Sequence, residues 1–154
     1  VYTVKMNYTK EEFLIVLRQI HPGCKLKNTT YELIKKLLNK VFNKINQHIN
    51  IDNVNKEQLC NIINTVMPGE LAKQCCVEIN KEPSYLMLST NIIKNKLDIN
   101  DESVFAFTCA LEYILAEILE LSGDITKEKN KTFIKYGYVM DAIDRDEELK
   151  LLLS

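Results

Sequence analysis

Three glutamates lie within one of the most apolar stretches of the chain. The stretch is LEYILAEILEL, residues 111–121, and its acids are Glu112, Glu117 and Glu120. Two neighbouring carboxylates can act as general acid and base in catalysis. Carboxylates held on a helix can instead accept paired hydrogen bonds from an arginine. The third interpretation is an ordinary solvated helix face, which is the commonest fate of helical glutamates.

A helical wheel separates these acids from the apolar residues around them. At about 100° per residue, the three glutamates occupy one arc, and no lysine or arginine lies within the stretch. The opposite arc carries Val104, Phe107, Leu111, Ile114, Leu115, Ile118, Leu119 and Leu121. No nucleophile, pocket-forming loop or metal-ligand set accompanies the acids, so we expect no enzyme activity, metal or cofactor. The two remaining interpretations are a docking surface and a solvated face.

Size and composition restrict the class of protein. The chain has 154 residues, enough for one globular core. Its net charge of −1 by itself argues neither for nor against binding of nucleic acid. Five cysteines without a C-x-x-C pair indicate free thiols in a reducing compartment. Apolar runs fall far below the roughly 18 residues of a membrane span, so we expect no membrane contact. With no catalysis expected, we also expect no small-molecule substrate. Because the chain begins with Val, we expect it to be a fragment of a longer protein.

The elements that must position the acids are predicted to be helices. Strand alternation is nowhere sustained, and Thr9 with Glu12 and Thr29 with Glu32 resemble capping boxes that open helices. Helical periodicity and the positions of Gly and Pro predict helices over residues 9–20, 29–50, 55–66, 68–79, 90–96, 102–122, 138–145 and 147–153. Gly123 is taken as the end of the longest apolar helix, and residues 127–135 as a basic loop.

Each half of the chain repeats one plan, which is a short, a long and a short helix followed by a further one. A long helix between two short ones cannot bury its apolar face alone, so the halves, residues 1–82 and 83–154, are expected to pack on each other. Phe42, Phe105 and Phe107 are predicted to lie in the shared core.

Four motifs resemble core histones. VLRQIHP (16–22) and PGELAK (68–73) are similar to histone 2B, whereas LEYILAEILEL and DRDEEL (144–149) are similar to histone 2A. Their order in one chain resembles the fused histone doublets of large DNA viruses. The resemblance implies an all-α fold of two tandem histone folds, with a 2B-like half (1–82) and a 2A-like half (83–154) that form an intramolecular handshake pseudo-dimer.

The resemblance gives the acids a partner-docking role. In histones the matching residues form a patch that captures arginine anchors of chromatin factors. The positions that match this patch are Glu70, Glu78, Glu112, Glu117, Glu120, Asp146, Glu147 and Glu148, and all eight are acidic here. The docking surface is therefore the interpretation that the resemblance favours.

The resemblance also implies DNA contacts at two pairs of loops. Residues 21–28 should meet residues 127–135, and residues 51–56 should meet residues 97–102. The candidate DNA-binding residues are Lys25, Lys27, Lys56, Lys127, Lys129, Lys131, Thr132 and Lys135. The second pair is less basic, because Asp52, Asp98, Asp101 and Glu102 oppose Lys56 and Lys96. Phe133 replaces the arginine that histone 2A inserts into the minor groove, and we expect its ring to pack locally.

Two functions follow from these observations. The first is a structural chromatin protein that packages double-stranded DNA without sequence specificity, together with a histone 4–3 type partner. It would wrap DNA loosely through about six to nine lysines, with strong salt dependence. Its location would be chromatin, in a host nucleus or in a viral factory and virion. The alternative is a histone mimic that binds histone chaperones or chromatin factors with little affinity for DNA. A sequence-specific transcription-factor subunit is disfavoured, because no Arg or Asn cluster is placed to read bases.

Overall fold

One long central helix organises the fold, and shorter helices pack around it. The computed structural model describes residues 5–49, 54–81 and 86–154. Within these ranges the helices are α1 (Lys10–Ile20), α2 (Asn28–Asn46), α3 (Lys56–Val66), α4 (Gly69–Asn80), α5 (Asn91–Lys96), α6 (Asp101–Glu128), α7 (Tyr136–Arg145) and α8 (Glu147–Leu153). Two strands of two residues each, β1 (Lys25–Leu26) and β2 (Phe133–Ile134), complete the described part. The prediction of an all-helical chain is confirmed apart from this strand pair.

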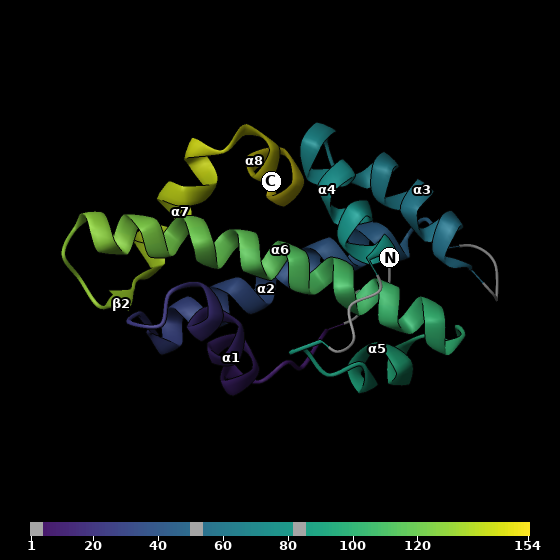
Figure 1. Ribbon diagram of the computed structural model, residues 1–154, viewed down its shortest axis with the longest axis horizontal. Coiled ribbons are helices and arrows are strands. Elements are labelled where there is room, and N and C mark those ends of the chain that lie inside the picture. Colours follow the sequence, from purple (N-terminus) through teal and green to yellow (C-terminus); the bar gives the residue numbers. More distant parts are fainter. Residues whose placement is uncertain (1–4, 50–53, 82–85) are drawn as a thin grey trace.

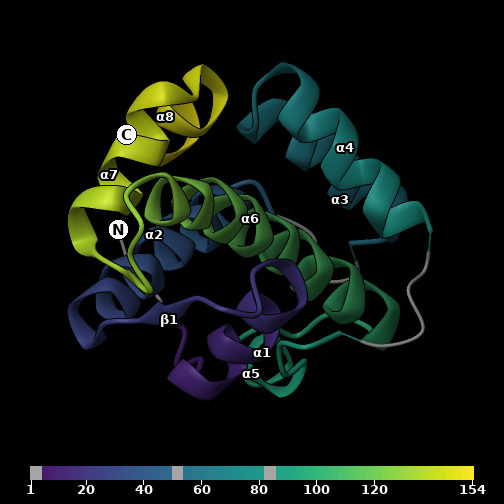
Figure 2. The ribbon, with the colours of Figure 1, turned by 60° about the vertical axis from the view of Figure 1, so that its left-hand side comes forward.

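Helix α6 runs through the middle of the molecule (Figure 1). It contacts α1, α2, α3, α4, α5 and α7, and α2 passes behind it in both ribbon views (Figures 1 and 2). The rings of Phe42 on α2 and Phe107 on α6 stack with centroids 5.1 Å apart. Both are fully buried, as predicted, whereas Phe105 is only half-buried. The two long helices therefore share one apolar core.

The two predicted capping boxes have different outcomes. The Thr9 box is confirmed, because the Glu12 amide donates to Thr9 Oγ1 at 3.2 Å and the Thr9 amide donates to Glu12 Oε1 at 3.0 Å. The second box is wrong. Helix α2 begins at Asn28, and the buried Thr30 hydroxyl donates to the Ile134 carbonyl at 2.7 Å. The N-cap residue of α2 is Lys27, which makes no side-chain capping bond.

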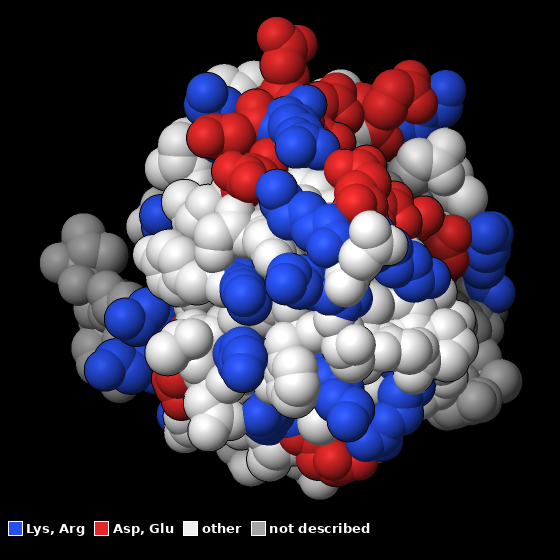
Figure 3. Space-filling view, turned by 90° about the vertical axis from the view of Figure 1, so that its left-hand side faces the viewer, with Lys and Arg blue, Asp and Glu red and all other residues white. Residues whose placement is uncertain are grey.

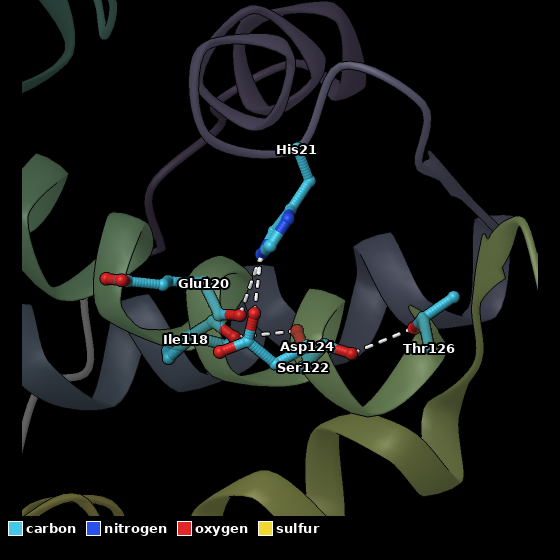
Figure 4. Close-up of polar contacts among 6 residues, drawn as sticks. All are labelled: His21, Ile118, Glu120, Ser122, Asp124 and Thr126. Carbon is cyan, nitrogen blue, oxygen red and sulfur yellow. Dashed lines mark hydrogen bonds and ion pairs between the residues drawn. The ribbon is translucent and has the colours of Figure 1, made fainter. Parts of the chain in front are cut away.

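Helix α6 does not end near Gly123. It continues to Glu128, so Lys127 lies on the helix and not in a loop. Gly123 faces the buried imidazole of His21, and a Cβ at this position would lie 2.7 Å from His21 Nε2. Figure 4 shows His21 pointing from the α1–β1 turn onto α6, where its Nε2 lies 2.9 Å from the Glu120 carbonyl oxygen. The small residue here allows a close approach between α6 and the His21 ring.

Two further boundaries differ from the predictions. Helix α2 ends at Asn46, earlier than expected, and α7 begins at Tyr136, which shortens the preceding loop. The expected connection between the two halves, at residues 82–84, lies outside the described residues. Within the described ranges, no helix combines the length and apolar character that crossing a membrane requires.

Candidate functional site

The two predicted basic segments lie side by side. Strands β1 and β2 pair in parallel, with Lys25 opposite Phe133 and Leu26 opposite Ile134. The Lys25 amide also donates to the Thr132 carbonyl at 2.9 Å. The predicted meeting of residues 21–28 with residues 127–135 is therefore confirmed. We call this region the basic end, and define it by its exposed residues Lys25, Lys27, Lys127, Lys129, Lys131, Thr132 and Lys135.

Two helix N-termini add positive charge to the basic end. Lys27 is the N-cap residue of α2 and Lys135 is the N-cap residue of α7, directly after β1 and β2 respectively. Unpaired amides at a helix N-terminus carry partial positive charge and favour anions. Figure 3 shows lysine and arginine side chains spread over the middle and lower part of this face, below a band of acids. The arrangement suits phosphate groups that lie along the surface.

Phe133 packs beside the lysines and not in the core. Lys27 Nζ lies 4.3 Å from the centroid of its ring and Lys25 Nζ lies 5.7 Å away, both within the range of a cation–π contact. The residue remains 37% exposed. The expected local packing of this ring is confirmed.

The second predicted loop pair is assembled differently. The Ser103 hydroxyl donates to the Val54 carbonyl, which brings the two segments together at the start of α6. Lys56 is half-buried there and lines a cavity of about 180 Å³ with Glu102, so it does not join the basic end. Lys94 pairs with Asp101 at 3.5 Å. Asp52, which also belongs to this prediction, lies outside the described residues.

Four of the predicted acids raise the pKa of two groups on α6. Burial raises the pKa of Tyr113, and the charges of Glu117, Glu78 and Glu148 raise it further. Burial likewise raises the pKa of the Cys109 thiol to about 11, with added effects from Glu112 and Glu78. We call the eight acids the acidic surface: Glu70, Glu78, Glu112, Glu117, Glu120, Asp146, Glu147 and Glu148.

Glu148 and Glu112 hold backbone amides of other segments. Both oxygens of Glu148 accept hydrogen bonds at the N-terminus of α4, from the Glu70 amide at 3.0 Å and the Leu71 amide at 2.8 Å. Glu112 Oε1 accepts from the amides of Met87 at 2.7 Å and Leu88 at 2.8 Å. Sequence reasoning missed these roles, because both depend on segments that are distant in sequence.

Asp146 also has a structural role, since its Oδ1 accepts from the Leu149 amide at 2.9 Å and caps α8. Two further acids form ion pairs with neighbours on or beside α4. Glu78 pairs with Lys81 at 2.9 Å, and Glu70 lies 4.0 Å from Lys73. Both pairs are exposed, so water and salt screen them strongly.

Glu117 and Glu120 lie three residues apart on α6. Glu117 is half-buried, and its pKa is raised by burial and then by the charges of Glu120 and Asp146. Glu120 and Glu147 are exposed. Among the described residues, no lysine or arginine forms an ion pair with Glu117 or Glu120. A guanidinium at this position would relieve repulsion between carboxylates and gain paired hydrogen bonds.

An adjoining groove was not predicted. It has a volume of about 190 Å³ and lies between α6 and α7, with Asp124, Glu128 and Asp146 among its lining residues. Arg145 partly neutralises it by pairing with Glu128 at 3.6 Å. Asp124 also lies 3.4 Å from His21 Nε2. The described ranges contain no group of three or more His, Cys, Asp or Glu side chains arranged to hold a metal ion.

Comparison with known proteins identifies partial relatives. No protein-family model matches the chain. Histone 2A.1 of Tetrahymena pyriformis is 46% identical over 44 residues, which cover 29% of this chain and 33% of the relative. Histone 2A.Z of Scheffersomyces stipitis is 37% identical over 61 residues, covering 40% of this chain and 46% of the relative. This chain is histone-like.

The similarity extends to plants but covers only part of each protein. Histone 2A.2.1 of Triticum aestivum is 48% identical over 44 residues, or 29% of each of the two chains. The histone-like chain thus spans between about a third and just under half of the length of the first relatives it matches. Its helices, grouped around α6, fit an all-α histone fold.

Proposed function

We propose that the histone-like chain is a structural, non-enzymatic chromatin protein that packages double-stranded DNA. In this proposal it is a 2B–2A doublet, in which the half formed by residues 1–82 and the half formed by residues 83–154 pair as a handshake. The order of helix lengths supports the pairing. Helices of 11, 19, 11 and 12 residues precede helices of 6, 28, 10 and 7 residues.

The observation that carries the proposal is the parallel pairing of β1 with β2. This pairing gathers exposed lysines from both ends of the sequence beside the N-termini of α2 and α7. Lysine is a point charge that binds phosphate without reading bases, so the binding would be independent of sequence and sensitive to salt. The partial similarity to histone 2A supports the same role.

The acidic surface completes the proposed function as a docking face for arginine anchors. Its centre at Glu117 and Glu120 would receive chromatin factors or chaperones, and a histone 4–3 type partner would complete a nucleosome-like particle. The particle would reside in chromatin, within a nucleus or, for a viral protein, within a viral factory and virion.

Titration of DNA by the purified chain tests the role of the basic end. Replacing Lys25 and Lys27 by Gln should weaken binding of a duplex, and should reduce the slope of log affinity against log salt by about 0.9 for each phosphate that is no longer neutralised. Lys73→Gln with Lys81→Gln is the matched control, because these exposed lysines lie on or beside α4, next to acids. Equal weakening by the two double variants would contradict the proposal.

Reconstitution with a histone 4–3 partner and DNA tests the packaging role. Because Phe133 replaces an arginine, nuclease should trim the DNA ends further than in a cellular nucleosome, and Phe133→Arg should extend the protected length. Protection equal to that of a cellular nucleosome by the unchanged protein would refute loose wrapping.

A second candidate function is supported by Phe133, at the position where the resembling histone 2A motif has an arginine, and by the acidic surface. The chain would then be a histone mimic that binds chaperones or chromatin factors and has little affinity for DNA. Binding of an arginine-bearing peptide without measurable binding of duplex DNA at low salt would favour this candidate.

A further inference from the structure

Exposed aromatic rings interrupt the lysines of the basic end, and contacts to phosphate do not explain them. Tyr136 is 52% exposed and Phe133 is 37% exposed. Within the described ranges, the other large apolar side chains with comparable exposure are Val77, Met140 and Leu151, none of them aromatic. The two most exposed Phe and Tyr rings of this part of the chain thus lie within four consecutive residues, at the site that gathers cations.

Tyr136 forms one wall of an open groove of about 390 Å³. The first two turns of α2 form the other wall, which includes Asn28, Leu33 and the exposed Lys36. Glu32 also lines the groove, but its carboxylate pairs with Lys35 at 3.4 Å. The groove therefore combines an aromatic face and an apolar wall with a cation and an amide side chain.

The backbone that presents the rings is held in place. The Thr30 hydroxyl donates to the Ile134 carbonyl, and the Lys25 amide donates to the Thr132 carbonyl, on either side of Phe133. The centroid of the Tyr138 ring lies 5.8 Å from Lys129 Nζ and 5.9 Å from Lys135 Nζ. Tyr138 follows both exposed rings in the sequence. Rings on a fixed backbone lose little conformational entropy when a ligand binds.

Exposed rings that alternate with cations are the arrangement that binds unpaired nucleotides. Bases stack on aromatic side chains while lysines follow the phosphates, and this requires bases whose faces are open. A base pair inside a duplex is stacked on both faces. A duplex can therefore contact the lysines but cannot stack its bases on the exposed rings.

We propose that the basic end also binds single-stranded nucleic acid, with unpaired bases stacked on Tyr136 and Phe133 and with phosphates held by Lys25, Lys27 and Lys36. This inference rests on the proposed function, because Lys25 and Lys27 supply phosphate contacts in both. The groove beside Tyr136 accommodates a base, and the cations around Phe133 hold the neighbouring nucleotide.

Fluorescence anisotropy with a labelled oligo-dT strand and with a duplex of equal length tests the inference at one salt concentration. Tyr136→Leu and Phe133→Leu keep an apolar side chain but remove the ring. Each should weaken binding of oligo-dT by at least about fivefold and change binding of the duplex by less than about twofold. Met140→Leu, another exposed position on α7, is the matched control and should change neither.

The outcomes separate this inference from the proposed function. The double variant Lys25→Gln with Lys27→Gln should weaken binding of both oligo-dT and the duplex. Unchanged affinity of this variant for the duplex would overturn the proposed function. Unchanged affinity for oligo-dT after removal of the rings would overturn only the inference. If removal of the rings weakened binding of oligo-dT and of the duplex equally, the inference would also be overturned. That result would mean that the rings only support the packing of the basic end. Photocrosslinking of a 5-bromodeoxyuridine strand, mapped by mass spectrometry, should identify Tyr136 or Phe133.

Discussion

Glu117 is the residue at which stability and the proposed docking role oppose each other. Its pKa is raised in the folded protein, so the charged form is disfavoured by folding. The protonated Glu117 contributes its full stability below the pKa that this side chain has in the unfolded chain. This contribution is lost as the pH rises through the higher pKa of Glu117 in the folded protein. Glu117→Gln should therefore raise Tm at pH 7, and the difference should vanish below about pH 4. Thermal melts across this range measure it, and a lower Tm at pH 7 would contradict it.

The same carboxylate gives arginine binding a dependence on pH. A protonated Glu117 attracts a guanidinium weakly, so affinity for an arginine-bearing peptide should fall as the pH is lowered through the raised pKa. Glu117→Gln should cost about tenfold in affinity at neutral pH, the effect of losing roughly 1.5 kcal/mol of charge-assisted hydrogen bonding. Calorimetric titrations measure both effects. Glu57→Gln, at an exposed acid on α3, is the control and should change neither.

The close approach of Gly123 to His21 gives a prediction about packing. Gly123→Ala adds a methyl group against a buried imidazole and should destabilise the fold by about 1–3 kcal/mol. Gly137→Ala on α7 is the matched control, because a Cβ there meets nothing within 4 Å. It should be stabilising by roughly 0.4–1 kcal/mol. Denaturant titrations compare the two, and His21→Ala should make Gly123→Ala less harmful.

At the scale of elements, one side chain of the α7–α8 corner caps the start of α4. Glu148 accepts from two amides there, and Gly69, at φ +38°, lies so close to its carboxylate that a Cβ would collide with it. Glu148→Ala should cost about 0.5–2 kcal/mol, as the loss of a helix cap does. Hydrogen exchange should quicken at Glu70 and Leu71. The exposed neighbour Glu147→Ala should leave these amides protected, and equal exchange in both variants would contradict the capping role.

Local patterns in the sequence predicted most elements, and tertiary contacts explain where they failed. The Thr9 cap and the buried Phe42 follow from nearby residues, and the structure confirms both. The capping box predicted at Thr29 does not form, and the helix predicted to end near Gly123 continues to Glu128. Gly123 instead contacts His21, more than a hundred positions away. The meeting of the two basic segments was predicted from the resemblance. The amide contacts of Glu112 and Glu148 have no local signal.

At the scale of the whole molecule, α6 joins the two halves into one core. Because it contacts α1, α2, α3 and α4, neither half can bury its apolar face alone. Cleavage at a protease site inserted between residues 82 and 85 should leave two fragments that elute together in size-exclusion chromatography. Each fragment expressed alone should lack cooperative thermal unfolding. Separation of the fragments under native conditions would contradict a shared core.

The pairing of β1 with β2 makes the basic end a product of completed folding. Lys25 and Phe133 lie more than a hundred positions apart in the sequence, so their pairing closes a long loop of the chain. Contacts between such distant residues form slowly, since the chain must close a long loop before the contact stabilises anything. A nascent or truncated chain therefore presents its lysines scattered, and only the finished fold offers them as one surface. The proposed binding of nucleic acid would therefore depend on the completed fold.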